Sequence, residues 1–157
     1  MGLGGADMKH LQVAALRNGT VIDHIPASKL FKVFSLLNLQ NCEETITVGN
    51  NLNSNTLGKK GIIKISDRFF SQDEANKIAL IAPKAKINII KEYEVVEKRL
   101  LSLPEEVREI VQCMNPACIT NHQPVATYFH VVSEEHETHL RCHYCERDVK
   151  LEEVRIK

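Results

Sequence analysis

Apolar residues in the first third of the chain follow two different periods. Residues 20–26 (TVIDHIP) form a mainly apolar run that ends at a proline, as expected of a strand. Between residues 28 and 39, apolar side chains at positions 30, 31, 34 and 37 recur with the spacing of one helix face. The pattern therefore predicts a strand followed by a helix.

The next segment changes to a period of two. Residues 44–49 (ETITVG) alternate between polar and apolar, which is typical of a strand with one buried face. Residues 50–61 are rich in Asn and Gly and are expected to form a loop. A further short strand is predicted for residues 61–66 (GIIKIS).

A second helix is expected after residue 71. Ser71 and Glu74 form the S-x-x-E pattern of a capping box, and Pro83 sets a limit on the helix that they open. A last strand is predicted from Ile87 to Val96. The resulting order, β-α-β-β-α-β, is that of a ferredoxin-like fold, in which two helices cover one face of an antiparallel sheet.

The fold class predicted for the whole chain is α+β with two domains. Residues 10–103 are expected to form the ferredoxin-like α/β sandwich and residues 104–157 a small all-β domain with four cysteines. Its strands are predicted in residues 125–132, 138–145 and 148–154. Residues 1–9 are expected to be a flexible leader.

The charge distribution follows the same division. The chain has no net charge, but residues 1–103 hold 14 Lys/Arg against 10 Asp/Glu, whereas residues 104–157 hold 6 against 10. Two segments of opposite charge favour two domains with different partners. Neither segment has the clustered basic face of a nucleic-acid binder.

No apolar run is long enough to cross a bilayer, and the first residues lack the apolar core of a secretory signal. We therefore expect a cytoplasmic protein without a membrane partner.

Four cysteines stand in two close pairs, Cys113-x4-Cys118 and Cys142-x2-Cys145. Two such pairs separated by a few tens of residues are typical of a tetrahedral zinc site with four thiolate ligands. A segment of this size needs a staple to fold, and zinc supplies one. Four protein ligands leave no open position, so the predicted zinc is structural, one ion per chain.

Two alternatives for the cysteines stay open at this point. Two disulfides would require an oxidising compartment, which no secretory signal supports. A redox-active Cys142-x2-Cys145 would leave the other pair without a role. The histidines near the cysteines are read as surface residues, and Cys42 as an ordinary thiol.

Several stretches together resemble the regulatory chains of aspartate carbamoyltransferase. They are RNGTVIDHIP, GKKGIIKI, APKAKINII, YEVVEK, SLPE and the cysteine spacing, and they run from about Leu11 to the last strand. The resemblance implies a non-catalytic regulatory subunit of pyrimidine biosynthesis, with an N-terminal domain that binds CTP or ATP, and UTP as a further candidate. No catalytic constellation is found in the sequence.

The resemblance also implies an effector site in the N-terminal domain. Asp23 and Lys64 would contact the ribose, and His24 and Lys98 would face the triphosphate. In a strand, Asp23 and His24 would point to opposite faces. The residues expected around the base are Ala15, Leu16, Val21, Tyr93 and Val95.

The implied partners are the catalytic chain and a second regulatory chain. The zinc domain would dock on the catalytic chain and link catalytic trimers, with Asn115, Glu146 and Arg147 as candidate interface residues. A homodimer would form through the N-terminal domain, with residues 30–48 as a candidate surface. The alternative function is a zinc-ribbon module for nucleic-acid binding or protein docking, and the acidic C-terminal segment disfavours nucleic acid.

Overall fold

The structure, a computed structural model, describes residues 16–157. The chain divides after Leu101 into two compact units, the second of which spans Ser102–Lys157. The predicted leader, residues 1–9, and the predicted site residue Ala15 lie outside the described residues. Within residues 16–157, no helix combines the length and the apolar character needed to cross a membrane.

The first unit is built on a five-stranded antiparallel sheet. Its strands run in the spatial order β2-β3-β1-β4-β5. Their bounds are β1 (Gly19–Pro26), β2 (Ile46–Ser54), β3 (Gly58–Ser66), β4 (Lys86–Lys91) and β5 (Glu94–Arg99). The order of the first four strands is that of the ferredoxin-like fold. The predicted fold class is thus confirmed, and β5 is an addition to it.

The single last strand predicted from Ile87 to Val96 is wrong, because the chain reverses within it. Glu92 and Tyr93 have positive φ angles, 49° and 67°, and form the tip of a hairpin between β4 and β5. Such two-residue turns need positive φ at both positions and usually contain Asn or Gly. Here neighbouring residues hold the turn, because Asn18 Oδ1 accepts the Glu92 N–H and Arg17 pairs with the Glu92 carboxylate.

The loop predicted for residues 50–61 is mostly strand. β2 continues to Ser54 and β3 begins at Gly58, so only three residues separate them. Pairs such as Leu52↔Lys60 and Ser54↔Gly58 extend the ladder to its end. An Asn-rich composition favours loops. Here the apolar residues of β2 and β3 fix the register, and the polar residues that follow them pair in the same register up to the turn.

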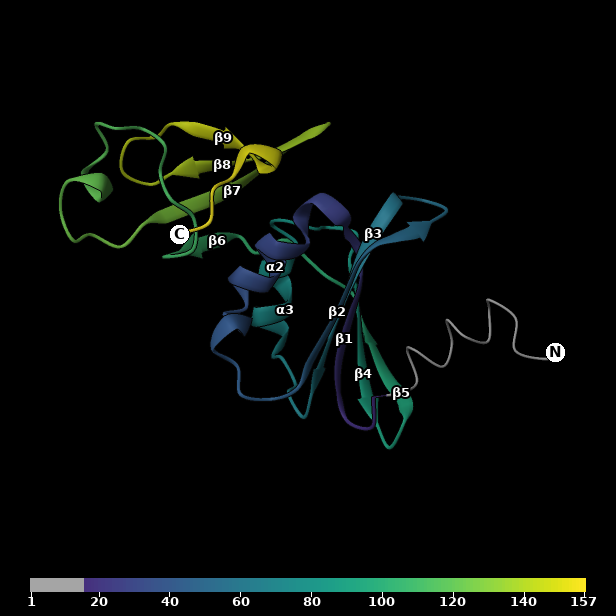
Figure 1. The fold of residues 1–157 in the computed structure, drawn as a ribbon. Helices are drawn as coiled ribbons and strands as arrows, with labels where there is room; N and C mark the ends of the chain where they lie inside the picture. The colour runs from purple at the N-terminus through teal and green to yellow at the C-terminus, as the bar shows by residue number, and fades with distance from the viewer. Residues whose placement is uncertain (1–15) are drawn as a thin grey trace. The chain divides into compact units, whose positions relative to one another are not determined.

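The helices of this unit cover one face of the sheet (Figure 1). They are the 3₁₀ turn η1 (Ala27–Lys29), α2 (Leu30–Leu36), η2 (Leu39–Asn41) and α3 (Gln72–Ile78). Helix α3 begins at the predicted capping box: Ser71 accepts the Glu74 N–H, and the Glu74 carboxylate accepts the Ser71 N–H. Under the helices, the sheet contributes a fully buried row, Ile63, Ile22 and Ile87, that forms the core with Leu30, Val33 and Ile78.

The second unit is a four-stranded antiparallel sheet in the order β6-β7-β8-β9. Its strands are β6 (Glu106–Arg108), β7 (Tyr128–Glu134), β8 (Glu137–Cys142) and β9 (Asp148–Lys150). The 3₁₀ turns are η3 (Ile119–Asn121) and η4 (Leu151–Glu153). The sequence pattern predicted β7 and β8. It predicted a strand over residues 148–154, of which β9 covers only the first three. It did not predict β6, because three residues are too few to show a period.

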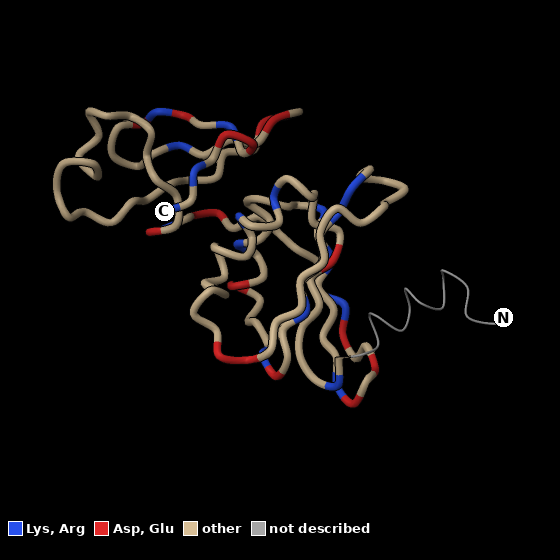
Figure 2. The backbone as a smooth tube through the Cα atoms, in the orientation of Figure 1, with Lys and Arg blue, Asp and Glu red and all other residues tan. Residues whose placement is uncertain are grey.

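Figure 2 shows how charged residues follow these elements. In the first unit, lysines mark the start of β3, next to the uncharged turn that joins it to β2. In the second unit, the glutamates Glu134, Glu135 and Glu137 lie around the turn of the β7–β8 hairpin.

Candidate functional site

Asp23 and His24 lie on a β-bulge, so the strict alternation expected for them is interrupted. Ile22 pairs with Ile63 and Ile25 with Gly61, which leaves two residues of β1 opposite one residue of β3. His24 takes a left-handed φ of 61°. Its N–H donates to Asp23 Oδ1 at 2.6 Å, and its Nδ1 lies 3.9 Å from the same oxygen. The bulge therefore brings the two titratable groups together.

The Asp23 carboxylate has a second partner that sequence reasoning placed only on a neighbouring loop. Lys60 lies on β3, is almost fully buried, and its Nζ is 2.9 Å from Asp23 Oδ1 and 3.2 Å from Oδ2. A buried ion pair of this kind holds its neighbours in one geometry, because separating the charges there is unfavourable. Asp23 and Lys60 thus form a fixed polar anchor beside His24.

A row of side chains crosses the sheet on the face opposite the helices. Register pairs join Lys64 on β3 to Val21 on β1, Val21 to Asn88 on β4, and Asn88 to Lys98 on β5. Directly paired residues of a sheet point to the same face. The structure therefore places three of the predicted effector residues, Val21, Lys64 and Lys98, in one line, with Asn88 between them.

The two lysines of the row differ in their environment. Lys64 is half-buried, and burial lowers its pKa below the ordinary range. Lys98 is exposed on the edge strand. Among residues 16–157, neither lysine forms an ion pair within 4 Å. Both charges are therefore available to an anion on this face.

A small apolar cluster lies next to the row on the same face. Leu16, Val21 and Ile90 are buried together, and the half-buried Ile62 packs against them. The cluster is separate from the core under the helices, as alternation along the strands requires. Its half-buried member, Ile62, lies two residues before Lys64 on β3 and therefore on the same face.

Tyr93 and Val95 occupy the β4–β5 hairpin and are exposed. Tyr93 is 56% and Val95 is 44% exposed, and the Tyr93 N–H donates to the Arg17 carbonyl at 3.0 Å. Val95 pairs with Ile90, so it borders the apolar cluster from the edge strand. Sequence reasoning placed both residues on one strand, whereas Tyr93 lies in the turn that leads into it.

The four cysteines of the second unit converge. Their sulfur atoms all lie within 4.8 Å of one another, with 3.6 Å between Cys113 and Cys145 and 3.7 Å between Cys118 and Cys142. Four sulfurs bound at about 2.3 Å around a tetrahedral ion lie about 3.8 Å apart. None of the chain's five cysteines forms a disulfide. The cluster therefore fits a four-coordinate metal ion.

The protonation of these thiols also fits a metal site. Burial raises the pKa of Cys113 to about 12 and raises that of Cys142. At Cys145, burial also disfavours the thiolate, but hydrogen bonds with the Asn115 side chain and the Arg147 backbone outweigh it and lower the pKa to about 7. The buried sulfurs thus need the charge of a cation to become ligands.

Each cysteine pair is held by a local turn. Asn115 Oδ1 accepts the Ala117 N–H, and the Asn121 side chain donates to the carbonyls of Cys113 and Asn115. In the second pair, the Glu146 N–H donates to the Cys142 carbonyl, and Glu146 itself is left-handed. Asn115, predicted at a partner interface, is therefore engaged inside the metal unit.

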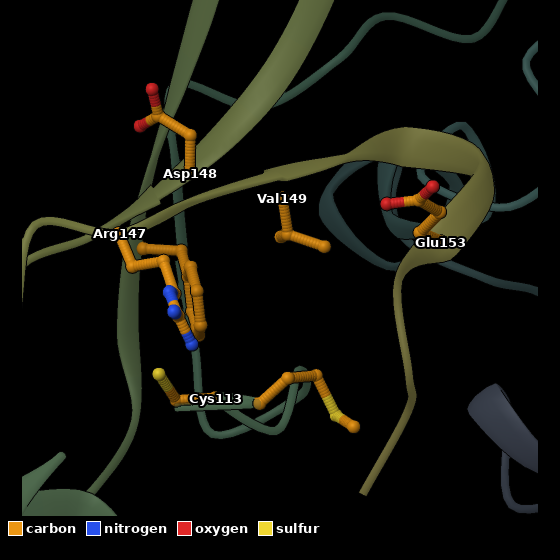
Figure 3. Close-up of a pocket in the computed structure, with 7 residues that line it drawn as sticks. Cys113, Arg147, Asp148, Val149 and Glu153 are labelled. Carbon is orange, nitrogen blue, oxygen red and sulfur yellow. The ribbon is translucent and has the colours of Figure 1, made fainter. Parts of the chain in front are cut away.

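A pocket of about 230 Å³ lies beside Cys113. It is lined by Cys113, Met114, Phe129, Arg147, Asp148, Val149 and Glu153. Figure 3 shows Arg147 and Val149 pointing into this space, whereas Asp148 points away from it. The predicted interface residue Arg147 thus lies at a concave surface next to the cysteines.

Comparison with known proteins decides the family. The model of the aspartate carbamoyltransferase regulatory chain, allosteric domain, matches residues 11–102, and that of its metal binding domain matches residues 105–155. The chain belongs to the family of aspartate carbamoyltransferase regulatory chains. This confirms the resemblance that the sequence motifs indicated.

Several curated regulatory chains are similar to this one over nearly their whole length. The regulatory chain from Phocaeicola vulgatus is 56% identical over 146 residues, 93% of this chain and 94% of its own length. That from Parabacteroides distasonis is 56% identical over 149 residues, 95% and 96% of the two chains. That from Thermococcus sibiricus is 50% identical over 143 residues, 91% and 94% of the two chains.

Two residues of this regulatory chain's polar face were not singled out as site residues from the sequence. From the sequence, Lys60 is expected on the loop of residues 50–61, where it would only add to the positive field near the effector site, and Asn88 is a strand residue without an assigned role. Their positions follow from register, which pairs Asn88 with both Val21 and Lys98 and brings Lys60 to Asp23. Only a known strand order could have found them.

Proposed function

We propose that this chain is a non-catalytic allosteric subunit of aspartate carbamoyltransferase in pyrimidine biosynthesis. Residues 10–103 form the domain that binds CTP or ATP, with UTP as a further effector, and residues 104–157 form the zinc domain that joins catalytic trimers. The observation that carries the nucleotide part is the row Lys64, Val21, Asn88 and Lys98, next to an apolar cluster and the bulge at Asp23 and His24.

The chemistry of a nucleoside triphosphate matches these groups. Lys98 and His24 face the phosphates, because cationic donors bind phosphate oxygens through strong charge-assisted hydrogen bonds. Lys64 and Asp23 bind the ribose, with Asp23 fixed by Lys60 and the His24 N–H. Leu16 and Val21 supply apolar packing for the base, with Ala15, Tyr93 and Val95 around it.

The nucleotide site is tested by calorimetric titration of the full chain with CTP and then ATP. We expect one site per chain with competition between the two nucleotides. Loss of one charged contact costs about 1.5–3 kcal/mol, so Lys64→Met and Lys98→Ala should each weaken CTP binding about tenfold or more. Lys84→Ala, an exposed lysine in the turn before β4, is the control and should bind as the parent does.

Single-stranded DNA in the same titration separates this proposal from the nucleic-acid alternative. Binding of DNA without binding of CTP would overturn the effector site. Unchanged CTP affinity in Lys98→Ala would remove Lys98 from it.

We further propose that the ion of the four-cysteine cluster is zinc and that this unit docks on the catalytic chain. Thiolate ligands in tetrahedral geometry favour zinc. Arg147 at the pocket and the exposed Glu146 beside it offer charges for salt bridges. Asn115, whose side chain holds the turn between Cys113 and Cys118, offers an amide for a hydrogen bond to the same partner. Metal analysis of the purified chain should give one zinc ion per chain.

Docking is measured by sedimentation of the chain mixed with catalytic trimers. Arg147→Ala should weaken the complex while zinc content stays at one ion. Glu152→Ala, exposed in η4 and not among the residues that line the pocket, is the matched control. Equal assembly by both variants would exclude Arg147 from the interface.

We also propose that two regulatory chains pair through the N-terminal domain. Strand β2 is an edge of the sheet, and Phe31 and Val48 in the expected surface of residues 30–48 are 67% and 40% exposed. An edge strand with apolar residues is a template for pairing with another chain. Val48→Lys should give monomers by sedimentation, while a persistent dimer would move the interface elsewhere. The assembly is proposed to work in the cytoplasm.

A further inference from the structure

A cluster of aromatic and imidazole rings lies outside the four-cysteine site in the second unit. Tyr128 and His130 come from β7, and His143 comes from the turn between Cys142 and Cys145. His143 stacks on Tyr128 with 4.4 Å between ring centroids, and His130 Nε2 lies 2.9 Å from His143 Nδ1. His143 is exposed and His130 half-buried, so the two nitrogens are close to solvent.

The spacing of the two imidazole nitrogens suits a metal ion as well as a proton. In the hydrogen-bonded form, one ring donates an N–H to the lone pair of the other. Imidazole binds divalent transition metals with nitrogen–metal distances of about 2.0–2.1 Å. When two such nitrogens bind one ion with a nitrogen–metal–nitrogen angle of 90°, they lie about 2.9 Å apart, because the distance between them is √2 times the bond length. The observed 2.9 Å is an ordinary hydrogen-bond length, and it also fits this arrangement around an ion.

A carboxylate stands next to the pair. Glu106 on β6 pairs directly with His130 across the sheet, and its Oε1 accepts a hydrogen bond from Tyr128 at 2.9 Å. Arg108 lies 3.7 Å from the other carboxylate oxygen and 3.8 Å over the Tyr128 ring. The guanidinium opposes a cation, so a site here is weaker than the four-thiolate cluster.

We propose that His130 Nε2 and His143 Nδ1 form a second, solvent-open binding site for a divalent transition metal such as Ni²⁺ or Zn²⁺, with water completing the coordination. Imidazole nitrogens suit these ions. Because His143 stands between two cysteine ligands, the turn that carries it is fixed when the four-cysteine cluster is loaded. The second site therefore fills after the first.

In the test, Ni²⁺ is titrated into the zinc-loaded full chain, and binding is measured by calorimetry and by NMR of the ¹⁵N-labelled chain. Ni²⁺ is chosen because it is paramagnetic and leaves thiols unoxidised. We expect one Ni²⁺ per chain beyond the zinc, with broadening at His130, His143 and Tyr128. Removing a residue that only hydrogen-bonds to a metal ligand weakens metal binding by about 10–100-fold. His130→Asn and His143→Asn each remove a proposed ligand itself, so each should weaken Ni²⁺ binding at least about tenfold.

Two further variants keep the proposal testable. Glu106→Gln retains an acceptor for the Tyr128 hydroxyl and should weaken Ni²⁺ binding less than the histidine variants do. His136→Gln, in the exposed turn between β7 and β8, should bind Ni²⁺ as the parent does. One zinc ion in each variant shows that the unit is folded. Absence of Ni²⁺ uptake, unchanged uptake in His130→Asn, or loss of uptake in His136→Gln would overturn the proposal.

Discussion

Different forces stabilise the two units of this chain. The first packs two helices on one face of a five-stranded sheet, and its fully buried residues include large side chains such as Ile22, Leu30 and Phe70. The second has four short strands and few buried apolar residues, among them Phe129 and Leu140, with three buried cysteines beside them. One unit has a hydrophobic core of its own, while the other is organised around its sulfur atoms.

The comparison teaches where each unit can change without unfolding. Hydrophobic stabilisation spreads over many contacts, so the first unit can leave one sheet face to polar residues such as Lys64 and Asn88. A metal cluster concentrates stabilisation at four atoms, so the surface of the second unit is free to vary while the cysteines are not. The predictions below test this difference, from the largest effect to the smallest.

Removing the metal should unfold the second unit and leave the first folded. Structural zinc in small domains contributes an apparent free energy of about 10–16 kcal/mol, more than a sheet of this size supplies. Chelator added to the full chain should abolish dispersed NMR signals from β7 and β8 and leave those of β1 and β4 unchanged. Cys113→Ser should act like the chelator, and Cys42→Ser, a thiol of the first unit, should not. Retained signals from β7 after complete chelation would contradict the comparison.

Core truncation should have the converse effect. Ile22→Ala removes a fully buried side chain under the helices and should lower the free energy of unfolding of the first unit by about 2–5 kcal/mol. Leu140→Ala, equally buried on β8, should leave the metal-loaded second unit folded because the ion still closes it. Urea unfolding, monitored through the NMR signals of each unit, gives the free energy of unfolding of each unit in both variants. Metal loss from Ile22→Ala would show that the units are not independent.

Metal affinity should depend on pH in a way set by the thiols. The pKa of Cys113 is raised to about 12, so its proton is displaced by metal at any pH below that value. Cys145, with a pKa of about 7, gives up a proton to metal below pH 7 but is already ionised above it. The apparent metal affinity therefore falls as the pH falls. Below pH 7, protonation of Cys145 adds a loss of about tenfold in affinity, or about 1.4 kcal/mol, for each pH unit.

Proton release on adding zinc, measured in weak buffer at pH 6 and pH 8, checks this expectation. About one proton more should be released at pH 6. Equal release at both pH values would show that Cys145 does not ionise between pH 6 and pH 8.

The smallest effect is expected at the capping box. Ser71→Ala removes the hydroxyl that accepts the Glu74 N–H and should lower the stability of the first unit by about 1 kcal/mol. Ser28→Ala in η1, where no side chain caps the turn, is the matched control. Thermal melting of both variants, with unchanged metal content, measures the difference. A loss equal in the two variants would mean that the cap adds nothing.

Much of this chain could be predicted from local patterns. The Ser71 capping box, the cysteine spacing and the motif GTVIDHIP each depend on residues close in sequence, and each indicated its structure or family correctly. Gly19, the first residue of that motif, has a φ of 145° and leaves no room for a side chain, because a Cβ would lie 2.0 Å from the Ile65 carbonyl oxygen. Such constraints show in one sequence because they act over a few residues.

The tertiary structure decided the rest, and it did so through strand register. The turn at Glu92 and Tyr93 has neither Asn nor Gly, and it is held by Arg17 and Asn18, which precede β1. The bulge at His24 and the burial of Lys60 against Asp23 depend on how β1 meets β3. The sequence by itself determined the family, the four-cysteine cluster and most elements. Which polar residues share the open face was settled only when five strands aligned, because each pair is distant in sequence and joined by main-chain hydrogen bonds that any residue can form.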